Sequence, residues 1–233
     1  MTLRQSFLRA LIFGLPGIVI LTFVATPPAG IPRIALAINP FFMLILLGGL
    51  GAWSVTRTGL RSGLLRGDSI DVQTLAKLAG FAVLAGVAVA VADHLATPYW
   101  RAEGATQPQS LAEAANLGGL VLGLSYGGVT EEILMRWGLM AGVMAGLMRF
   151  LSRENAASSA IAIAAALFAI GHLPALAVAG VETTPALFSR VLLINAVLGL
   201  WFGWLYFKRD LESAMSAHMG VHIGAFSAGI ALI

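Results

Sequence analysis

Six ionisable side chains stand within long apolar stretches of this sequence. They are Glu131, Glu132, Arg136, His172, His218 and His222. Placing such a group inside a bilayer costs roughly 2.5 to 3.5 kcal/mol on insertion scales, so each of the six is by default a candidate site residue. The fourth histidine, His94, follows Asp93 near the end of an apolar run. We expect His94 at the membrane interface.

The two adjacent glutamates are predicted to have different surroundings. Glu132 and Arg136 are four residues apart with the acid first, which is the favourable orientation for an ion pair within a helix. Glu131 lies about 100° away from Glu132 around the helix, so it can face a cavity while its neighbour is occupied by the arginine. In a cavity it could act as a general base towards water. A purely structural salt bridge is the alternative, and it leaves Glu131 unpaired.

A second pair of residues places an imidazole beside a phenyl ring. Phe168 and His172 are four residues apart, so both lie on one face of a helix. A lone buried histidine is usually structural, but the other intramembrane polar groups favour a catalytic role for this one. We expect Pro174 to end or kink the helix and to free carbonyl groups near His172.

The last two histidines, His218 and His222, have the same spacing and can point into one cavity. The His-Glu-x-x-His zinc motif uses this spacing, but no acid stands between these two histidines, so the motif is absent. By ligand type alone, Glu131, His172, His218 and His222 could still hold a divalent metal such as zinc. A site without a cofactor is the main prediction, and the metal site is the alternative.

Membrane-spanning helices are predicted to position these groups. Of the 233 residues, 58% are hydrophobic and 11% are charged, whereas soluble domains carry roughly 25% charged residues. Apolar runs of about twenty residues are long enough to cross a bilayer. We therefore predict an all-α, polytopic transmembrane bundle of about seven spans. The expected spans are Phe7–Thr26, Ile34–Val55, Leu75–Leu95, Leu111–Phe150, Ala156–Ala175, Ala186–Phe207 and Leu211–Ile233.

We expect these spans to form a single membrane domain, 1–233. Residues 1–110 supply three N-terminal spans without motifs, and 111–233 form the core that carries the candidate residues. The first apolar run resembles a signal peptide but extends past the usual length, so we interpret it as a retained helix. Cysteine is absent, which excludes disulfides, thiolate metal sites and a cysteine nucleophile.

The fourth predicted span is too long for one perpendicular crossing, since it would extend for roughly 60 Å. It must tilt, project from the bilayer, or break near Gly127 and Gly128. Two series of glycines at four-residue spacing predict close helix packing along it. They are Gly119, Gly123 and Gly127, and then Gly138, Gly142 and Gly146.

The distribution of basic residues predicts the orientation, because positively charged connections stay cytoplasmic. With a cytoplasmic N-terminus and seven spans, most basic residues fall on the inner side. The inner group is Arg4, Arg9, Arg57, Arg61, Arg66, Lys77, Arg149, Arg153, Lys208 and Arg209, and the outer group is Arg33, Arg101 and Arg190. Since these residues cluster at span ends instead of along one stripe, we expect no nucleic-acid partner. Many arginines and few lysines, with abundant alanine and glycine, fit a bacterial inner membrane.

The three groups of residues together resemble the motifs of the CPBP family, which contains the type II CAAX prenyl endopeptidases and bacterial bacteriocin-processing and self-immunity proteins. The Glu-Glu-x-x-x-Arg motif is matched by Glu131, Glu132 and Arg136. The Phe-x-x-x-His motif is matched by Phe168 and His172. The final His-x-x-x-Asn/Asp motif begins at His218, but its last position is His222. The likeness covers roughly residues 119–233.

The resemblance implies a membrane-embedded protease. Glu131 and His172 would activate a water molecule, and His218 with His222 would stabilise the oxyanion. A histidine can donate a hydrogen bond as asparagine does, so the oxyanion site could survive the departure at His222. The departure equally favours a metal-bound variant or a member that no longer cleaves.

Three functions follow from these patterns. The first is an intramembrane endopeptidase that hydrolyses a peptide bond of a membrane-associated or lipidated substrate. The second is a catalytically silent binding or immunity protein of the same family, and the third is a proton-coupled transporter. The expected partners are the lipid bilayer and a peptide or protein substrate.

One expectation conflicts with the predicted spans. Glu131 and His172 lie about 18 residues from the nearest inner arginine, whereas His218 lies about nine residues from Arg209. On straight helices this is a difference in depth of roughly 15 Å. Helix tilt or a projecting fourth helix must absorb it if the site is to converge.

Overall fold

A computed structural model of the protein describes residues 1–101, 109–178 and 184–232. Within these ranges the chain is helical and contains no strand. The helices are α1 (Leu3–Val24), α2 (Ala35–Thr58), α3 (Gly63–Arg66), α4 (Val72–Leu95), α5 (Thr97–Trp100), α6 (Leu117–Leu122), η1 (Gly123–Glu131), η2 (Ile133–Met140), α7 (Ala141–Leu147), α8 (Arg153–Gly171), α9 (Leu173–Val178), α10 (Pro185–Lys208) and α11 (Leu211–Leu232).

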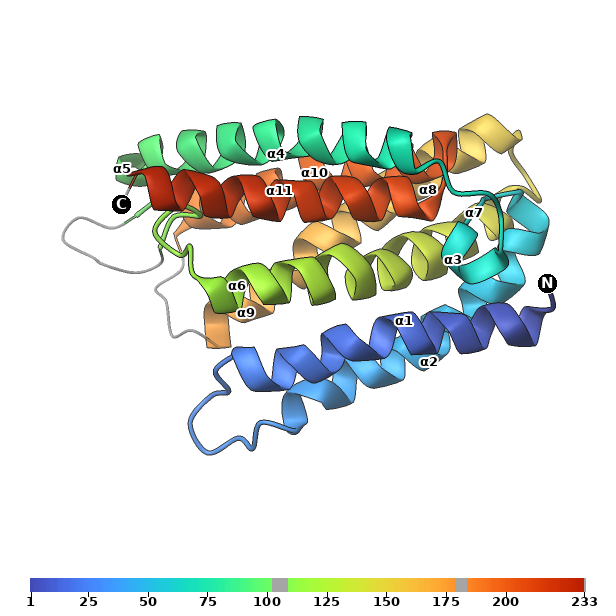
Figure 1. Ribbon diagram of the computed structural model, residues 1–233, viewed down its shortest axis with the longest axis horizontal. Helices are drawn as coiled ribbons and strands as arrows, with labels where there is room; N and C mark the ends of the chain where they lie inside the picture. The colour runs from blue at the N-terminus through green and yellow to red at the C-terminus, as the bar shows by residue number, and fades with distance from the viewer. Residues whose placement is uncertain (102–108, 179–183, 233) are drawn as a thin grey trace.

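The predicted transmembrane helical bundle is confirmed. Six helices of the described ranges are long and apolar enough to cross a membrane, judged by length and composition: α1, α2, α4, α8, α10 and α11. The fourth predicted span, Leu111–Phe150, is not among these six and corresponds to α6, η1, η2 and α7, which follow one another along one axis (Figure 1). The number seven and the side of the N-terminus stay predictions.

The fourth predicted span is shorter than expected and does not break. It begins at Leu117 because the Asn116 side chain caps the helix by accepting a hydrogen bond from the Gly119 amide. It ends at Leu147, and Gly127 and Gly128 lie inside η1. Both η1 and η2 have the wider π-helical hydrogen bonding, which is rare and frequent at functional sites. The predicted bounds 111 and 150 were therefore wrong, because the residues before Leu117 and after Leu147 form turns instead of helix.

The predicted fifth span also ends early. Helix α8 stops at Gly171, with His172 at its C-terminal cap, and the short α9 follows. Pro174 has no amide hydrogen to continue the ladder of α8, which explains the predicted end or kink at this point.

The fourth helix is central, as predicted. Elements α1 and α2 pack on one side of it, and α8 and α11 pack on others, while α4 lies along α11 and α10 along α8 (Figure 1). The α4–α11 contact is very close at two glycines. A Cβ atom on Gly86 would lie 2.2 Å from the Val221 carbonyl oxygen, and one on Gly224 would lie 2.1 Å from that of Val83.

The N-terminal helices hold the fourth helix through hydrogen bonds to their backbone. The Thr130 hydroxyl donates to the Gly14 carbonyl of α1 at 2.8 Å, and the Trp137 indole donates to the Gly48 carbonyl of α2 at 3.4 Å. Gly138 approaches Leu47 and Gly142 approaches Leu50 of α2, so these two glycines of the second series show the predicted close helix packing. Within that series, a Cβ atom on Gly146 would meet nothing within 4 Å.

The basic residues are segregated between the two ends of the bundle. The N-terminus, α3, the α7–α8 connection and the α10–α11 connection lie at one end (right in Figure 1). The α1–α2 connection, α5, the start of α6 and the C-terminus lie at the other. The predicted inner group therefore gathers at the first end, which we call the basic end, and the predicted outer group at the second.

The start of α11 is recessed within the basic end. Residues 211–218 of α11 are all buried, and α7 and α8 extend past them (Figure 1). The short helix α3 lies over this start, because the buried Glu212 carboxylate accepts hydrogen bonds from the Ser62 hydroxyl at 2.6 Å and from the Gly63 and Leu64 amides at 3.0 Å. This recess removes the predicted difference in depth, since it brings His218 to the level of Glu132.

Candidate active site

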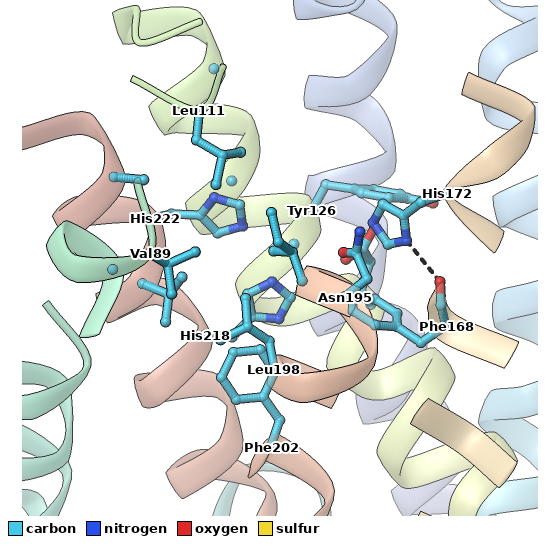
Figure 2. A pocket seen from close by; sticks show the side chains of 18 of the residues that line it. Val89, Leu111, Tyr126, Phe168, His172, Asn195, Leu198, Phe202, His218 and His222 are labelled. Atoms are coloured by element: carbon cyan, nitrogen blue, oxygen red, sulfur yellow. Dashed lines mark hydrogen bonds between the residues drawn. The ribbon is translucent and has the colours of Figure 1, made fainter. Parts of the chain in front are cut away.

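A cavity of about 350 Å³ lies in the middle of the bundle, between α4, η1, α8, α10 and α11 (Figure 2). The four predicted catalytic side chains all line it: Glu131, His172, His218 and His222. Glu131 is partly exposed, whereas Glu132 is fully buried. The structure therefore gives the two glutamates the different surroundings that the sequence predicts.

Glu132 and Arg136 form the predicted ion pair beneath the cavity. Arg136 Nε lies 3.2 Å from Glu132 Oε2, and both residues are at most 1% exposed. Arg136 Nη2 also donates to the Gly199 carbonyl oxygen at 3.3 Å. The guanidinium carbon faces the rings of Phe168 and Phe202, at 4.8 and 5.5 Å from their centroids. The ion pair thus ties the fourth helix to α8 and α10.

His218 has a partner that the sequence analysis missed. Its Nδ1 lies 2.8 Å from Glu132 Oε1, and its ring stacks between Phe202 at 4.6 Å and His222 at 5.0 Å. A carboxylate accepts hydrogen bonds only, so Nδ1 carries the proton and Nε2 is the nitrogen left for the cavity. The sequence contained one indication of this contact. Both oxygens of a fully buried carboxylate need hydrogen-bond partners, and Arg136 accounts for only one oxygen of Glu132.

The end of α8 orients His172. The His172 amide bonds to the Ala169 carbonyl, and the imidazole Nδ1 lies 2.7 Å from the Phe168 carbonyl oxygen (dashed line in Figure 2). Since a carbonyl only accepts, Nδ1 carries the proton and Nε2 keeps its lone pair. The ring meets the Phe168 ring edge to face at 4.6 Å, as the four-residue spacing predicts. His172 is therefore arranged as a proton acceptor.

The first glycine series makes room for imidazole rings, which corrects the predicted helix packing. A Cβ atom on Gly123 would lie 2.6 Å from His222 Cγ. One on Gly127 would lie 2.7 Å from His222 Nε2 and 3.4 Å from His218 Nε2. The two Nε2 atoms thus converge beside Gly127, on one wall of the cavity.

Residues 113–224 match the family model of the type II CAAX prenyl endopeptidases, Rce1-like. The chain carries an Rce1-like domain. The resemblance predicted from the three motifs is thereby confirmed, and all seven motif residues fall inside the match. A domain of this family implies a membrane protease, and the six long apolar helices agree with a multi-pass membrane protein. No curated protein and no solved structure matches the chain.

Two polar residues of the Rce1-like domain were not predicted as site residues. Asn195 and Tyr126 line the cavity, and Figure 2 shows both on the same side as His172. Asn195 Nδ2 donates to the Val191 carbonyl oxygen at 2.9 Å, so its side-chain oxygen is left as an acceptor. In the sequence, the polar side chain of Asn195 within the apolar run of α10 could have indicated this site residue.

An ion pair between the end of α4 and the start of α10 lies at one end of the cavity and connects these two helices. Arg190 lines the cavity and binds Asp93 through two hydrogen bonds of 2.6 and 2.7 Å. Asp93 is buried and also accepts from the Leu111 amide at 2.8 Å. His94, expected at the interface, is half-buried and lies 3.3 Å from the Ser110 hydroxyl. This cluster fixes the loop that precedes α6.

Glu113 in the same loop leads us to expect that the thermal stability of the protein falls at low pH. Hydrogen bonds from the Arg101 guanidinium and then the Ser110 amide lower the pKa of Glu113 from 4.5 to about 2. A lowered pKa stabilises the fold fully above the unfolded pKa, and that stabilisation is lost as the pH falls through about 2. We expect the Tm of the detergent-purified protein to fall more steeply below pH 4.5 than that of Glu113→Gln. Equal slopes for the two proteins would contradict this role of Glu113.

A metal-binding geometry is not found in the described residues, where no three His, Asp or Glu side chains are grouped to hold an ion. The predicted alternative ligand set shares one cavity, and His172 and His218 each use Nδ1 for a hydrogen bond to the protein and keep Nε2. The metal alternative stays a prediction that chelation tests.

Proposed function

We propose that the Rce1-like domain hydrolyses a peptide bond of a membrane-associated or lipidated substrate inside this cavity, with water as the nucleophile. The observation that carries the proposal is the shared cavity of Glu131, His172, His218 and His222. The Glu131 side chain makes no hydrogen bond to any other described residue, so its carboxylate is available to a bound water. The composition of the chain supports a bacterial inner membrane as its location.

In the proposed reaction, Glu131 accepts a proton from water while the His172 Nε2 lone pair orients that water. The water oxygen forms a bond to the peptide carbonyl carbon, and the carbonyl oxygen becomes an oxyanion. The proton held by Glu131 then passes to the nitrogen as the C–N bond breaks. The products are a carboxylic acid and an amine, so the atoms and charges balance.

The oxyanion would be bound on the wall beside Gly127. Glu132 holds the His218 ring through Nδ1, so that a proton on His218 Nε2 would donate towards the cavity. His222 Nε2 lies beside the same glycine and supplies a second donor. Glu132 acts through His218 in this scheme and is a positioning residue.

Substitution of His222 tests the second donor. We expect His222→Asn, which restores the residue typical of the family, to retain activity within about tenfold, because an amide can donate the same hydrogen bond. His222→Ala should lose about 10²- to 10³-fold, as other oxyanion sites do when one donor is removed. Cleavage of a C-terminal peptide library by the detergent-purified proteins measures both. Wild-type activity in His222→Ala would remove His222 from the mechanism.

A strong chelator distinguishes the glutamate mechanism from the metal alternative. We expect the rate of cleavage by the wild-type protein to be unchanged after chelation. Loss on chelation with recovery on adding zinc would instead assign the site to a metal.

The silent binding protein is the second candidate, and His222 at the position of the family's asparagine or aspartate favours it. That reading predicts no cleavage by the wild-type protein across the library, and gain of cleavage in His222→Asn.

A further inference from the structure

The cavity is asymmetric along the axis of the bundle. Its deep part is formed by buried side chains, with Phe202 fully buried and His218 only 5% exposed. From there its lining runs to Gly119 in the first turn of α6, to Arg190 near the start of α10 and to Leu111, all of which are partly or fully exposed. The cavity therefore opens at the end where α6 and α10 begin.

The other end of the cavity is closed. The recessed start of α11 is buried over residues 211–218, and Glu132 with Arg136 fills the space beneath His218. Helix α3 covers the buried start of α11 and is held there by three hydrogen bonds to Glu212. A substrate thus has no route to the site from the basic end through the described residues.

The two ends differ in charge as well. The closed end carries the larger group of basic residues, which the positive-inside rule assigns to the cytoplasm. At the open end, Arg190 is paired with Asp93, and Arg101 is paired with Glu113. The open end therefore faces away from the cytoplasm.

We propose that the cavity takes its substrate from the non-cytoplasmic side of the membrane. The substrate is then an extracytoplasmic segment of a membrane-associated peptide, and not a lipidated tail that stays in the cytoplasm. That the ligand is a peptide substrate rests on the proposed function. The side of the membrane from which it enters rests on the charge and geometry of the bundle.

The lining near the opening indicates the chemistry of that segment. It consists largely of apolar side chains, namely Val89, Leu111, Val191 and Ile194. A second cavity of about 130 Å³ shares Leu111, Gly119, His222 and Ala225 with the first and extends towards Phe226. Both favour an extended apolar peptide over a highly charged one.

The absence of cysteine makes a direct test simple, because any introduced thiol is the only one. Gln109→Cys marks the open end, Gln73→Cys marks the basic end, and Val191→Cys lies in the cavity near its opening. All three are to be labelled with a membrane-impermeant maleimide in right-side-out vesicles. We expect labelling of Gln109→Cys and Val191→Cys in sealed vesicles, and of Gln73→Cys only after permeabilisation.

Two results would overturn the proposal. Labelling of Gln73→Cys in sealed vesicles would reverse the orientation, and failure to label Val191→Cys from the side that labels Gln109→Cys would place the entrance elsewhere. Ala225→Cys, which lines both cavities, replaces Val191→Cys if that variant does not fold. The same labelling pattern is expected in a Glu131→Gln background, so loss of the proposed enzymatic activity leaves this test intact.

Discussion

Glu131→Gln is expected to lower the rate of peptide cleavage by about 10²- to 10⁴-fold, because an amide cannot accept the proton that a general base removes. The change is nearly isosteric, and the Glu131 side chain makes no hydrogen bond to the rest of the described chain, so the fold should be unaffected. The measurement is the initial rate of cleavage of a C-terminal peptide library in detergent, with Tm recorded on the same samples.

The matched control for this variant is Glu154→Gln, an exposed glutamate in the first turn of α8. It removes the same charge at a distance from the cavity and should leave the rate unchanged. A Glu131→Gln protein that cleaves at the wild-type rate would exclude Glu131 as the base, whatever the effect of the histidine variants.

Arg136→Ala is expected to produce the largest loss of stability, about 3 to 5 kcal/mol, because it leaves the charge of the fully buried Glu132 with only His218 as a partner. It also removes the contacts of the guanidinium with Phe168, Phe202 and Gly199. The free energy of unfolding can be followed by helical circular dichroism during titration with a denaturing detergent. Arg149→Ala, which removes an exposed arginine beyond α7, is the control and should change little.

Removal of both charges separates stability from chemistry. Glu132→Gln combined with Arg136→Met should recover part of the stability lost in Arg136→Ala, because no unpaired charge remains buried. Cleavage should stay low in the double variant, since His218 loses the carboxylate that holds its ring in position. If Arg136→Ala is as stable as Arg149→Ala, the buried ion pair has no structural role.

The parts of the site that depend on local helix geometry could be predicted from the sequence. The Glu132–Arg136 and Phe168–His172 contacts are each between residues four apart, and helical spacing determines them. The apolar runs likewise predicted the spans, although Asn116 and Pro174 moved two boundaries inward.

The parts that depend on tertiary contacts could not be predicted in this way. The bond from His218 to Glu132 joins residues 86 positions apart. The recess of α11 depends on α3, which has only four residues and no apolar period of its own. The spacing of Gly123 and Gly127 predicts contact with the backbone of a neighbouring helix. In the structure the imidazole ring of His222 lies against these two glycines instead.

The motif-free helices α1, α2 and α4 have a consequence for any attempt to shorten this protein. The residue next to Glu131, Thr130, is anchored to the backbone of α1, and the turn of α11 between the two site histidines fits against Gly86 of α4 at a separation that only glycine permits. A fragment of residues 111–233, which contains the family match, would lose both supports. We expect it to be inactive by itself and to regain cleavage only when residues 1–110 are supplied as a separate chain, so the catalytic machinery is the property of two interlocked halves of the polypeptide.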